Sequence, residues 1–273
     1  MKKGPGLVSS PIKQAFADGR VVIGTMIVQV RAPAIIQLLA NYGLEFVFLD
    51  MEHGPYNLET AADLIQVARL AGITPLVRVP DTQYHMYARL LDAGAQGIMT
   101  PRVECADQVR QIMRYSKYPP MGQRGFSRLA AHVDFAEIDF REYVRWANDN
   151  LLNFIQIESK AGVEALPEMI AVPGIDGVVI GMDDLALSLG VAGNTKDPLA
   201  EHMLERIVAT CEAHTMPWGL HLPDTERLVH WIERGMMIAT FSSDIWMFQE
   251  VLQEGMQKLR AAAAPGETGQ PDS

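Results

Sequence analysis

The feature that most constrains the fold of this chain is an alternation of short apolar runs with longer segments of helical period. Apolar runs of this length are typical of parallel strands buried on both faces, and helix-length connections are typical of strand–helix crossovers. The predicted strands are Val21–Met26, Phe46–Asp50, Pro75–Val79, Gly97–Thr100, Asn153–Glu158, Gly177–Gly181, Trp218–Leu222 and Ile238–Ser242. The predicted helices span roughly residues 32–42, 58–71, 82–93, 104–117, 161–170, 198–215, 224–234 and 245–262.

This series of strand–helix units in a chain of 273 residues matches a (β/α)8 or TIM barrel in number and length. The main alternative, a doubly wound open sheet, usually carries a glycine fingerprint after its first strand. Here the first strand continues into IVQVRA, which has no such fingerprint. We therefore expect one α/β barrel domain over residues 1–262. Residues 263–273 are small, polar and interrupted by proline, so we expect a disordered tail.

One irregular stretch, residues 118–150, separates the fourth and fifth predicted strands. It contains YPPMGQRGFSRLAAH and then a predicted helix near residues 140–149. A long loop inside a compact domain usually serves function. We expect residues 118–135, together with a neighbouring subunit, to contribute to the pocket for a second substrate.

The composition excludes several classes of protein. The net charge is −10 and no cluster of lysine or arginine is present, so nucleic acid is not an expected partner. No run of eighteen apolar residues is present, so no membrane span is expected, and the N-terminal MKKGPGLVSSPIKQ lacks the apolar core of a signal peptide. We expect a cytoplasmic protein in which Cys105 and Cys211 are reduced thiols packed in helices.

Polar side chains gather at the carboxyl ends of the predicted strands, where a barrel carries its active site. A convergent set from several strands is a stronger signal than one polar residue. The candidates are Asp50, Glu52, His53, Arg78, Gln156, Glu158, Asp183, Asp184, His221, Ser242, Ser243 and Asp244.

The alternation of side chains along a strand places Gln156 and Glu158 on one face with Phe154. Burying an amide and a carboxylate on the same face is costly unless each has a partner. The same holds for Arg78, which lies between two valines. A purely structural Arg78–Glu158 ion pair is the alternative to a functional role for both residues.

Glu158 and Asp184 follow adjacent predicted strands, which lie about 4.8 Å apart. Two carboxylates at that range repel each other unless a positive charge lies between them. A divalent cation fits, because Mg²⁺ binds one or two protein carboxylates and keeps several waters. Its open positions would accept a substrate with two adjacent oxygens, such as a 2-oxo acid. A metal-free acid–base pair is the competing interpretation.

His53 is the natural base of the set, because histidine titrates near neutrality. Asp50, three residues earlier, is placed to orient the ring, and Glu52 is a candidate anchor for the loop. His221 is equally consistent with a packed core histidine. For Asp183 we favour a role as the cap of a short helix, DDLALSLG.

The positions of the lysines disfavour an imine mechanism. A Schiff-base aldolase needs a lysine inside a barrel strand. The lysines are Lys2, Lys3, Lys13, Lys117, Lys160, Lys196 and Lys258, and none lies in a predicted strand. A metal-dependent enolate mechanism is therefore preferred.

Five ordered motifs give the chain a resemblance to a known family. They are FVFLDMEHGPYN, PLVRVP, YPPMGQRG, FIQIES and GVVIGMDDLA. In order and spacing they resemble the HpcH/HpaI aldolase family, the class II (metal-dependent) pyruvate aldolases of the 4-hydroxy-2-oxoheptanedioate and 2-keto-3-deoxy sugar-acid type. The resemblance extends from about residue 24 to the last helix. It implies a barrel of the phosphoenolpyruvate/pyruvate-domain type.

The resemblance also implies roles for individual residues. Glu158 and Asp184 would bind Mg²⁺, Mn²⁺ or Co²⁺, and the 2-oxo acid, typically pyruvate, would chelate that metal. Arg78 would stabilise the metal-bound enolate. His53, oriented by Asp50, would act as the base.

Further implied roles concern substrate binding and assembly. Gln156 would lie near the pyruvate, and Gly181, Asp183 and the adjacent backbone amides would hold its carboxylate. Members of the family are typically hexamers, with the last helix packed on a neighbour. The expected reaction is reversible cleavage of a 4-hydroxy-2-oxo acid to pyruvate, or a close 2-oxo acid, and an aldehyde.

The chain departs from the family pattern where substrate is held. The family often has GPxDLS where this chain has GMDDLA, so Met182, Asp183 and Ala186 differ from the pattern. These differences keep a second enolate reaction open, a citrate-synthase-like condensation in siderophore assembly. A non-catalytic barrel that binds a small acid is a third and more remote reading of the sequence.

Overall fold

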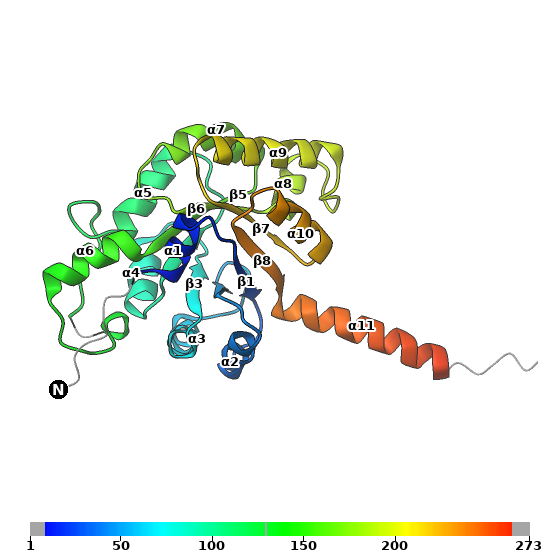
Figure 1. Ribbon diagram of the computed structural model, residues 1–273, viewed down its shortest axis with the longest axis horizontal. Helices are drawn as coiled ribbons and strands as arrows, with labels where there is room; N and C mark the ends of the chain where they lie inside the picture. The colour runs from blue at the N-terminus through cyan, green and yellow to red at the C-terminus, as the bar shows by residue number, and fades with distance from the viewer. Residues whose placement is uncertain (1–8, 129, 264–273) are drawn as a thin grey trace, which may run out of the picture.

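The computed structural model describes residues 9–128 and 130–263, and its parallel strands close into one barrel in the order β1 to β8 (Figure 1). The predicted barrel is confirmed, and the predicted strand ends are correct to within one residue. Residues 264–273, most of the predicted tail, lie outside the described residues. The strands are β1 (Val22–Ile27), β2 (Phe46–Asp50), β3 (Thr74–Arg78), β4 (Gly97–Thr100), β5 (Leu152–Ile157), β6 (Gly177–Ile180), β7 (Trp218–Leu222) and β8 (Ile238–Ser243).

Helices follow the strands as predicted, with ends that move by up to two residues. They are α1 (Pro11–Ala17), α2 (Ala34–Asn41), α3 (Leu58–Ala71), α4 (Tyr84–Asp92), α5 (Ala106–Ser116), η1 (Ala131–Val133), α6 (Phe140–Asn150), α7 (Lys160–Ile170), α8 (Met182–Ser188), α9 (Pro198–Ala213), α10 (Thr225–Glu233) and α11 (Asp244–Ala263). Helix α1 and the single turn η1 were not predicted from the sequence. Helix α1 had a local signal, because Ser10 caps it and Pro11 occupies its first turn.

The barrel interior is a packed apolar layer, and α1 contributes to it. Ile12 and Ala15 of α1 cluster with Phe46, Phe48 and other inward-facing side chains of the strands. Large rings fit because small residues face them. A Cβ added at Gly24 would lie 2.4 Å from the Phe46 ring. The interior is therefore filled at one end, and only its carboxyl end is left for a site.

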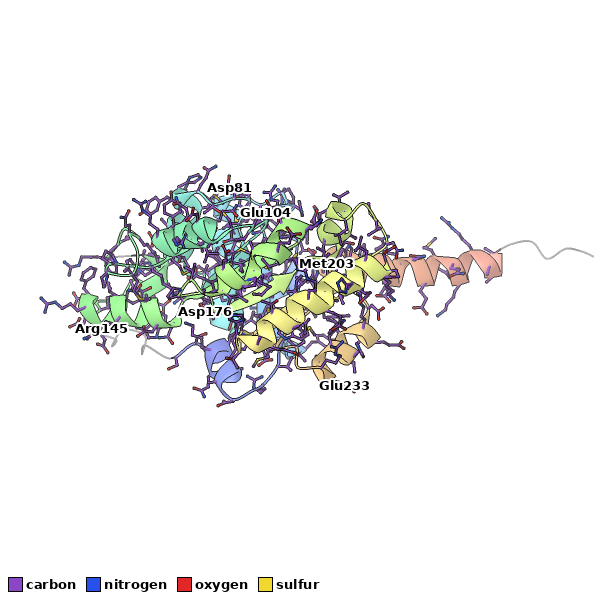
Figure 2. The ribbon with its side chains drawn as sticks, turned by 90° about the horizontal axis from the view of Figure 1, so that it is seen from above. Asp81, Glu104, Arg145, Asp176, Met203 and Glu233 are labelled. Atoms are coloured by element: carbon purple, nitrogen blue, oxygen red, sulfur yellow. The ribbon has the colours of Figure 1, made fainter. Side chains whose placement is uncertain are left out.

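A second and larger apolar cluster fills the space between the strands and the surrounding helices. Helix α11 is the exception, because it projects away from the barrel in both views (Figures 1 and 2). Asp244 is its buried residue, whereas its apolar side chains are exposed. These exposed side chains are Ile245, Phe248, Val251, Leu252, Met256 and Leu259. Among the described residues, no helix combines the length and hydropathy needed to cross a membrane.

The irregular stretch between β4 and β5 folds back onto the outside of the barrel. Arg124 is buried, lies over the Tyr118 ring, and donates to Asp92 of α4 across 2.7 Å. Phe126 and Tyr143 add edge-on ring contacts to the same cluster. The predicted helix near residues 140–149 is confirmed as α6. Cys105 is exposed at the start of α5, so the expectation that it is a packed thiol is wrong, whereas Cys211 is buried as expected.

Lys117 shows how the end of α5 is fixed. Its ammonium group is buried and donates to the carbonyl oxygens of Asn148 and Leu151 over 2.6 and 2.9 Å. Burial lowers the pKa of Lys117 from its ordinary value of 10.5 to about 8. A neutral amine still has two N–H donors, so Lys117 keeps both hydrogen bonds when it is deprotonated.

This pKa shift predicts a pH dependence of stability. Between pH of about 8 and 10.5, the unfolded state binds the Lys117 proton and the folded state does not. The free energy of unfolding should therefore gain a contribution that rises with pH across that window. Urea midpoints at pH 8 and pH 10 for the wild type and Lys117→Met measure it. Parallel changes in the two proteins would contradict the prediction.

Candidate active site

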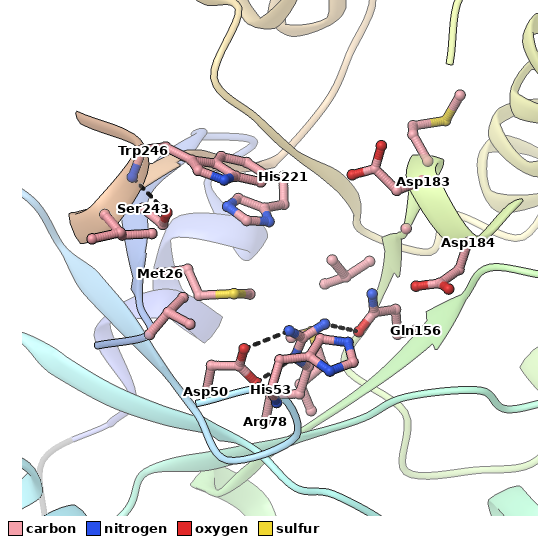
Figure 3. A pocket seen from close by; sticks show the side chains of 16 residues that line it. Met26, Asp50, His53, Arg78, Gln156, Asp183, Asp184, His221, Ser243 and Trp246 are labelled. Atoms are coloured by element: carbon pink, nitrogen blue, oxygen red, sulfur yellow. Dashed lines mark hydrogen bonds and ion pairs between the residues drawn. The ribbon is translucent and has the colours of Figure 1, made fainter. Parts of the chain in front are cut away.

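A cavity of about 260 Å³ opens at the carboxyl ends of the strands (Figure 3). Apolar side chains form its floor, among them Met26, Met99 and Val179. Most of the residues proposed from sequence line its walls. Those residues are Asp50, His53, Arg78, Gln156, Gly181, Asp183, Asp184, His221 and Ser243. Of the described part of residues 118–135, none lines this cavity. The expected contribution of this loop to a pocket for a second substrate stays a prediction.

Asp50 and Arg78 form a buried ion pair at the top of β2 and β3. The two residues are direct partners in the strand register. Arg78 Nε and Nη2 donate to the two oxygens of Asp50 over 2.8 and 2.6 Å. Burial acts to raise the pKa of Asp50, but the hydrogen bonds and charge of Arg78 outweigh it, so the pKa lies below its ordinary value. Arg78 therefore binds Asp50 rather than Glu158, and the alternative of an Arg78–Glu158 pair is wrong.

Asp50 also fixes the segment that carries His53. Its Oδ1 accepts the backbone N–H groups of Glu52 and His53 over 3.0 and 3.3 Å. Asp50 thus orients His53, as predicted, but it binds the backbone of His53 rather than its ring. The His53 ring is largely exposed at the cavity mouth, and its Nε2 lies 3.9 Å from Glu52 Oε2.

The side chain of Glu52, which was predicted as a candidate anchor for the loop, is buried between two arginines. Its Oε2 lies 3.4 Å from Arg78 Nη1 and its Oε1 lies 3.2 Å from Arg102 Nε. Burial raises the pKa of Glu52, and the charges of Arg78, His53 and Arg102 oppose that rise. Glu52 therefore joins the His53 segment to the arginines, which fits the predicted role of a loop anchor.

Gln156 and Glu158 lie where the alternation along β5 predicted. Phe154 belongs to the interior cluster and Gln156 lines the cavity above it, whereas Ile155 and Ile157 belong to the outer cluster. Gln156 Oε1 lies 3.5 Å from Arg78 Nη1. Glu158 follows the last residue of the strand and is buried. The alternation of side chains along β5 thus determines which of its residues face the cavity.

Glu158 has one satisfied oxygen and one unsatisfied oxygen. Its Oε1 accepts the backbone N–H of Arg102 over 2.7 Å, whereas its buried Oε2 has no hydrogen-bond partner in the described part of the chain. Burial raises the pKa of Glu158 to about 7, and the charges of Glu52 and Asp184 add to the rise. A buried carboxylate oxygen without a partner is costly, so it marks a position that a cation would fill.

Asp183 and Asp184 lie in the first turn of α8, directly after β6. The residue at the start of that helix is Gly181, and no side chain caps it. The interpretation of Asp183 as a helix cap is therefore wrong. Both side chains line the cavity, and Figure 3 shows Asp184 beside Gln156.

These residues fit a divalent cation of the kind predicted. Glu158 and Asp184 supply carboxylate oxygens, which are hard ligands. Gly181 leaves space beside them, because an added Cβ would lie 2.5 Å from Glu158 Oε2 and 2.7 Å from Gln156 Nε2. Among the described residues, no group of three or more His, Cys, Asp or Glu side chains is arranged to hold a metal. A Mg²⁺-type site needs only two such ligands.

A neutral wall forms another side of the cavity. The His221 ring stacks on Trp246 with centroids 5.0 Å apart, and its Nε2 lies 2.8 Å from the Ser242 carbonyl oxygen. Burial lowers the pKa of His221 to about 4, so the imidazole is neutral at neutral pH. Its Nε2 carries the proton that the carbonyl accepts, and Nδ1 is left as an acceptor. His221 is thus both a packed histidine and a cavity residue (Figure 3).

Comparison with known proteins identifies the family. The family model for HpcH/HpaI aldolase/citrate lyase matches residues 25–255. The chain belongs to this family. It is 30% identical over 253 residues to the hydroxypyruvate/pyruvate aldolase of Roseovarius nubinhibens, covering 92% of this chain and 97% of that one. It is 31% identical over 243 residues to the 2-dehydro-3,6-dideoxy-6-sulfogluconate aldolase of Pseudomonas putida, covering 89% and 94%.

Solved structures of the family have the same fold. The HpcH/HpaI aldolase of Desulfitobacterium hafniense superposes with a TM-score of 0.89 at 31% identity, covering 95% of this chain and 99% of that one. The citrate synthase SbnG superposes with a TM-score of 0.83 at 27% identity, covering 93% and 98%. The family and its aldolase relatives confirm the predicted enzyme class, a carbon–carbon lyase of the class II aldolase type.

A substitution at Gly181 tests directly whether a cation binds beside Glu158. In Gly181→Ala, the added methyl would occupy the region between Glu158 and Gln156. We expect Mn²⁺ affinity to fall at least about tenfold, the scale seen when the surroundings of a metal ligand are disturbed. Isothermal titration with Mn²⁺ measures the affinity. The matched control is Gly255→Ala on α11, where nothing lies within 4 Å of the added Cβ; equal losses in the two variants would refute the assignment.

Proposed function

We propose that the chain is a divalent-metal-dependent aldolase that reversibly cleaves a 4-hydroxy-2-oxo acid to pyruvate, or a close 2-oxo acid, and an aldehyde. The observation that carries the proposal is the unpaired, buried Glu158 Oε2 near Asp184, in a site that also holds Arg78 and His53. Glu158 and Asp184 provide two carboxylates for a cation. Arg78 provides a guanidinium for a developing negative charge, and His53 provides an imidazole at the mouth of the cavity.

Glu158 and Asp184 would hold the cation, which we propose to be Mg²⁺, Mn²⁺ or Co²⁺. When bound, such an ion acts as a Lewis acid toward the keto oxygen of the 2-oxo acid. The oxygens of the two carboxylates suit these hard cations. Glu158 binds a cation in its ionised form, and the amide of Arg102 favours that form.

Arg78 would stabilise the charge that appears on the pyruvate unit. Asp50 occupies Nε and Nη2, so the guanidinium is rigid and its Nη1 corner is directed toward Gln156 and Glu52. A rigid donor needs little reorganisation as the enolate forms, and the loss of one such donor typically costs about 3 kcal/mol of barrier. Gln156 and the free amides of the first turn of α8, beside Gly181 and Asp183, would orient the carboxylate of the substrate.

His53 would handle the proton. In the cleavage direction, the 4-hydroxyl group loses a proton to the base and the bond between C3 and C4 breaks. The aldehyde leaves, and the electron pair stays on the pyruvate unit as an enolate, which then takes a proton at C3. The exposed ring at the mouth can exchange that proton with solvent.

Exchange of the pyruvate methyl protons tests this function without knowledge of the aldehyde. In D₂O with Mg²⁺ or Mn²⁺, we expect the methyl signal of pyruvate to decay in proton NMR spectra. Chelation should stop the decay and added metal should restore it. His53→Asn and the pair Glu158→Gln with Asp184→Asn should lower the rate at least about a hundredfold, the usual scale for loss of general acid–base catalysis. Full activity in the Glu158 and Asp184 variant would exclude the proposal, and no exchange in any protein would favour a non-catalytic barrel.

A citrate-synthase-like condensation is the second candidate, because the structure of SbnG resembles this chain at 27% identity. The aldolase interpretation is preferred, since the relatives from Roseovarius nubinhibens and Pseudomonas putida are aldolases. A product assay separates the two candidates. Oxaloacetate with acetyl-CoA should give no citrate, whereas pyruvate with a panel of aldehydes should give 4-hydroxy-2-oxo acids.

We also propose that the enzyme is a cytoplasmic homohexamer. The free thiols of Cys105 and Cys211 fit a reducing compartment. The exposed apolar side chains of α11 form a surface that a neighbouring subunit would bury, as the resemblance to the family implies.

Two charges placed on α11 test the assembly. Phe248→Glu with Val251→Glu puts carboxylates on the exposed apolar surface, so we expect dissociation toward smaller species. Light scattering coupled to size-exclusion chromatography measures the mass. Glu250→Gln, on an exposed position of the same helix, is the control and should leave the mass unchanged. A wild type that elutes as a monomer would rule out the hexamer.

A further inference from the structure

Arg102 has an unusual backbone conformation for its residue type. It follows β4 by two residues, and its φ is +53°, in the left-handed region. For a residue with a side chain, that region is disfavoured because Cβ comes too close to the backbone. Such conformations persist where the surrounding structure requires them, and they gather at functional sites.

The backbone N–H of Arg102 explains what the conformation achieves. It donates to Glu158 Oε1 over 2.7 Å. The other oxygen, Oε2, is buried and has no partner among the described residues. One amide therefore fixes the carboxylate and leaves its second oxygen unpaired beside Gly181. The chain is held on both sides of Arg102, by β4 before it and by the hydrogen bond from Val103 N–H to the Gln156 carbonyl oxygen after it. A change of φ at Arg102 would therefore shift the peptide group that carries this amide.

The side chain of Arg102 makes separate contacts. Its Nη2 donates to the Pro80 carbonyl over 2.8 Å, and its Nε lies 3.2 Å from Glu52 Oε1. Glu52 in turn lies 3.4 Å from Arg78 Nη1 through its other oxygen. The side chain of Arg102 is 63% exposed, so the ion pair by itself adds little to stability. The role of the Arg102 side chain is instead to hold the Glu52 carboxylate in position between two arginines.

We infer that Arg102 is a positioning residue with two separable parts: its backbone amide aims Glu158, and its guanidinium holds Glu52 against Arg78. The inference rests on the proposed function, in which Glu158 binds a cation. It extends that function to a residue that lines no part of the cavity. Arg102 thereby contacts both Glu52, which precedes it in the sequence, and Glu158, which follows it.

Two substitutions separate the parts. Arg102→Gly removes the side chain but suits the left-handed backbone, so the amide stays in place. Arg102→Val also removes the side chain, but a β-branched residue is strongly disfavoured there, so the amide moves. Mn²⁺ affinity, from isothermal titration without substrate, should stay within about twofold in Arg102→Gly and fall roughly 10- to 100-fold in Arg102→Val.

The exchange of pyruvate methyl protons at saturating Mn²⁺ measures the effect of the Arg102 guanidinium. Both variants should be slower than the wild type by about tenfold or more, because Glu52 loses the contact that keeps it beside Arg78 Nη1 and the His53 ring. Arg102→Lys, which keeps a cation near Glu52, should recover much of the rate. Thermal unfolding checks that each variant is folded, and Arg102→Ala replaces the valine variant if that one does not fold.

The outcomes are distinct. Equal Mn²⁺ affinity in the wild type, Arg102→Gly and the valine or alanine variant would overturn the role of the amide. Wild-type exchange rates in Arg102→Gly would overturn the role of the guanidinium. A wild type that binds no Mn²⁺ and exchanges no protons would overturn the proposed function itself, and the inference with it.

Discussion

The ion pair between Asp50 and Arg78 is the interaction on which the site depends. Closure of the parallel barrel makes these two residues register partners and directs both side chains to the interior. Below them the interior is filled by Phe46, Phe48 and other apolar side chains, so the polar layer can form only at the carboxyl end. With both Asp50 oxygens bound to it, the guanidinium has one orientation. That orientation sets the position of every group that Arg78 meets, including Gln156 and Glu52.

Above that pair, the site has more buried negative charge than its own cations neutralise. Asp50 and Glu52 share Arg78, and Glu52 also uses Arg102, so Glu158 has a backbone amide as its one hydrogen-bond donor. Burial raises the pKa of Glu158 to about 7, and the charges of Glu52 and Asp184 add to the rise. A bound divalent ion would neutralise the excess negative charge, and the substrate would then meet a cation and a rigid guanidinium in one small cavity. The opposite wall, made of neutral His221 and Trp246, adds no charge of its own.

Much of this was predictable from local pattern. Strand ends were correct to within a residue because short apolar runs have sharp limits. Gln156 and Glu158 were placed on the right face because alternation along a strand needs no knowledge of its neighbours. What could not be predicted concerns partners. The pairing of Arg78 with Asp50 and the contacts of Arg102 depend on where another part of the chain lies, and the Arg78–Glu158 pair had been only an alternative. The interpretation of Asp183 as a helix cap was wrong.

Hydrophobic period and chain order are local properties, so the barrel, its carboxyl end as the site and most of the residues that line the cavity could be predicted without the structure. Strand register and loop conformation set which carboxylate pairs with which cation, and both depend on contacts between distant parts of the chain. They also leave Glu158 Oε2 without a partner among the described residues. The left-handed turn at Arg102 places the amide that binds the other oxygen, and the absence of a Cβ at Gly181 leaves space beside Oε2. Gly181 could be named from the sequence, but its contact with Glu158 exists only when the strands close into a ring.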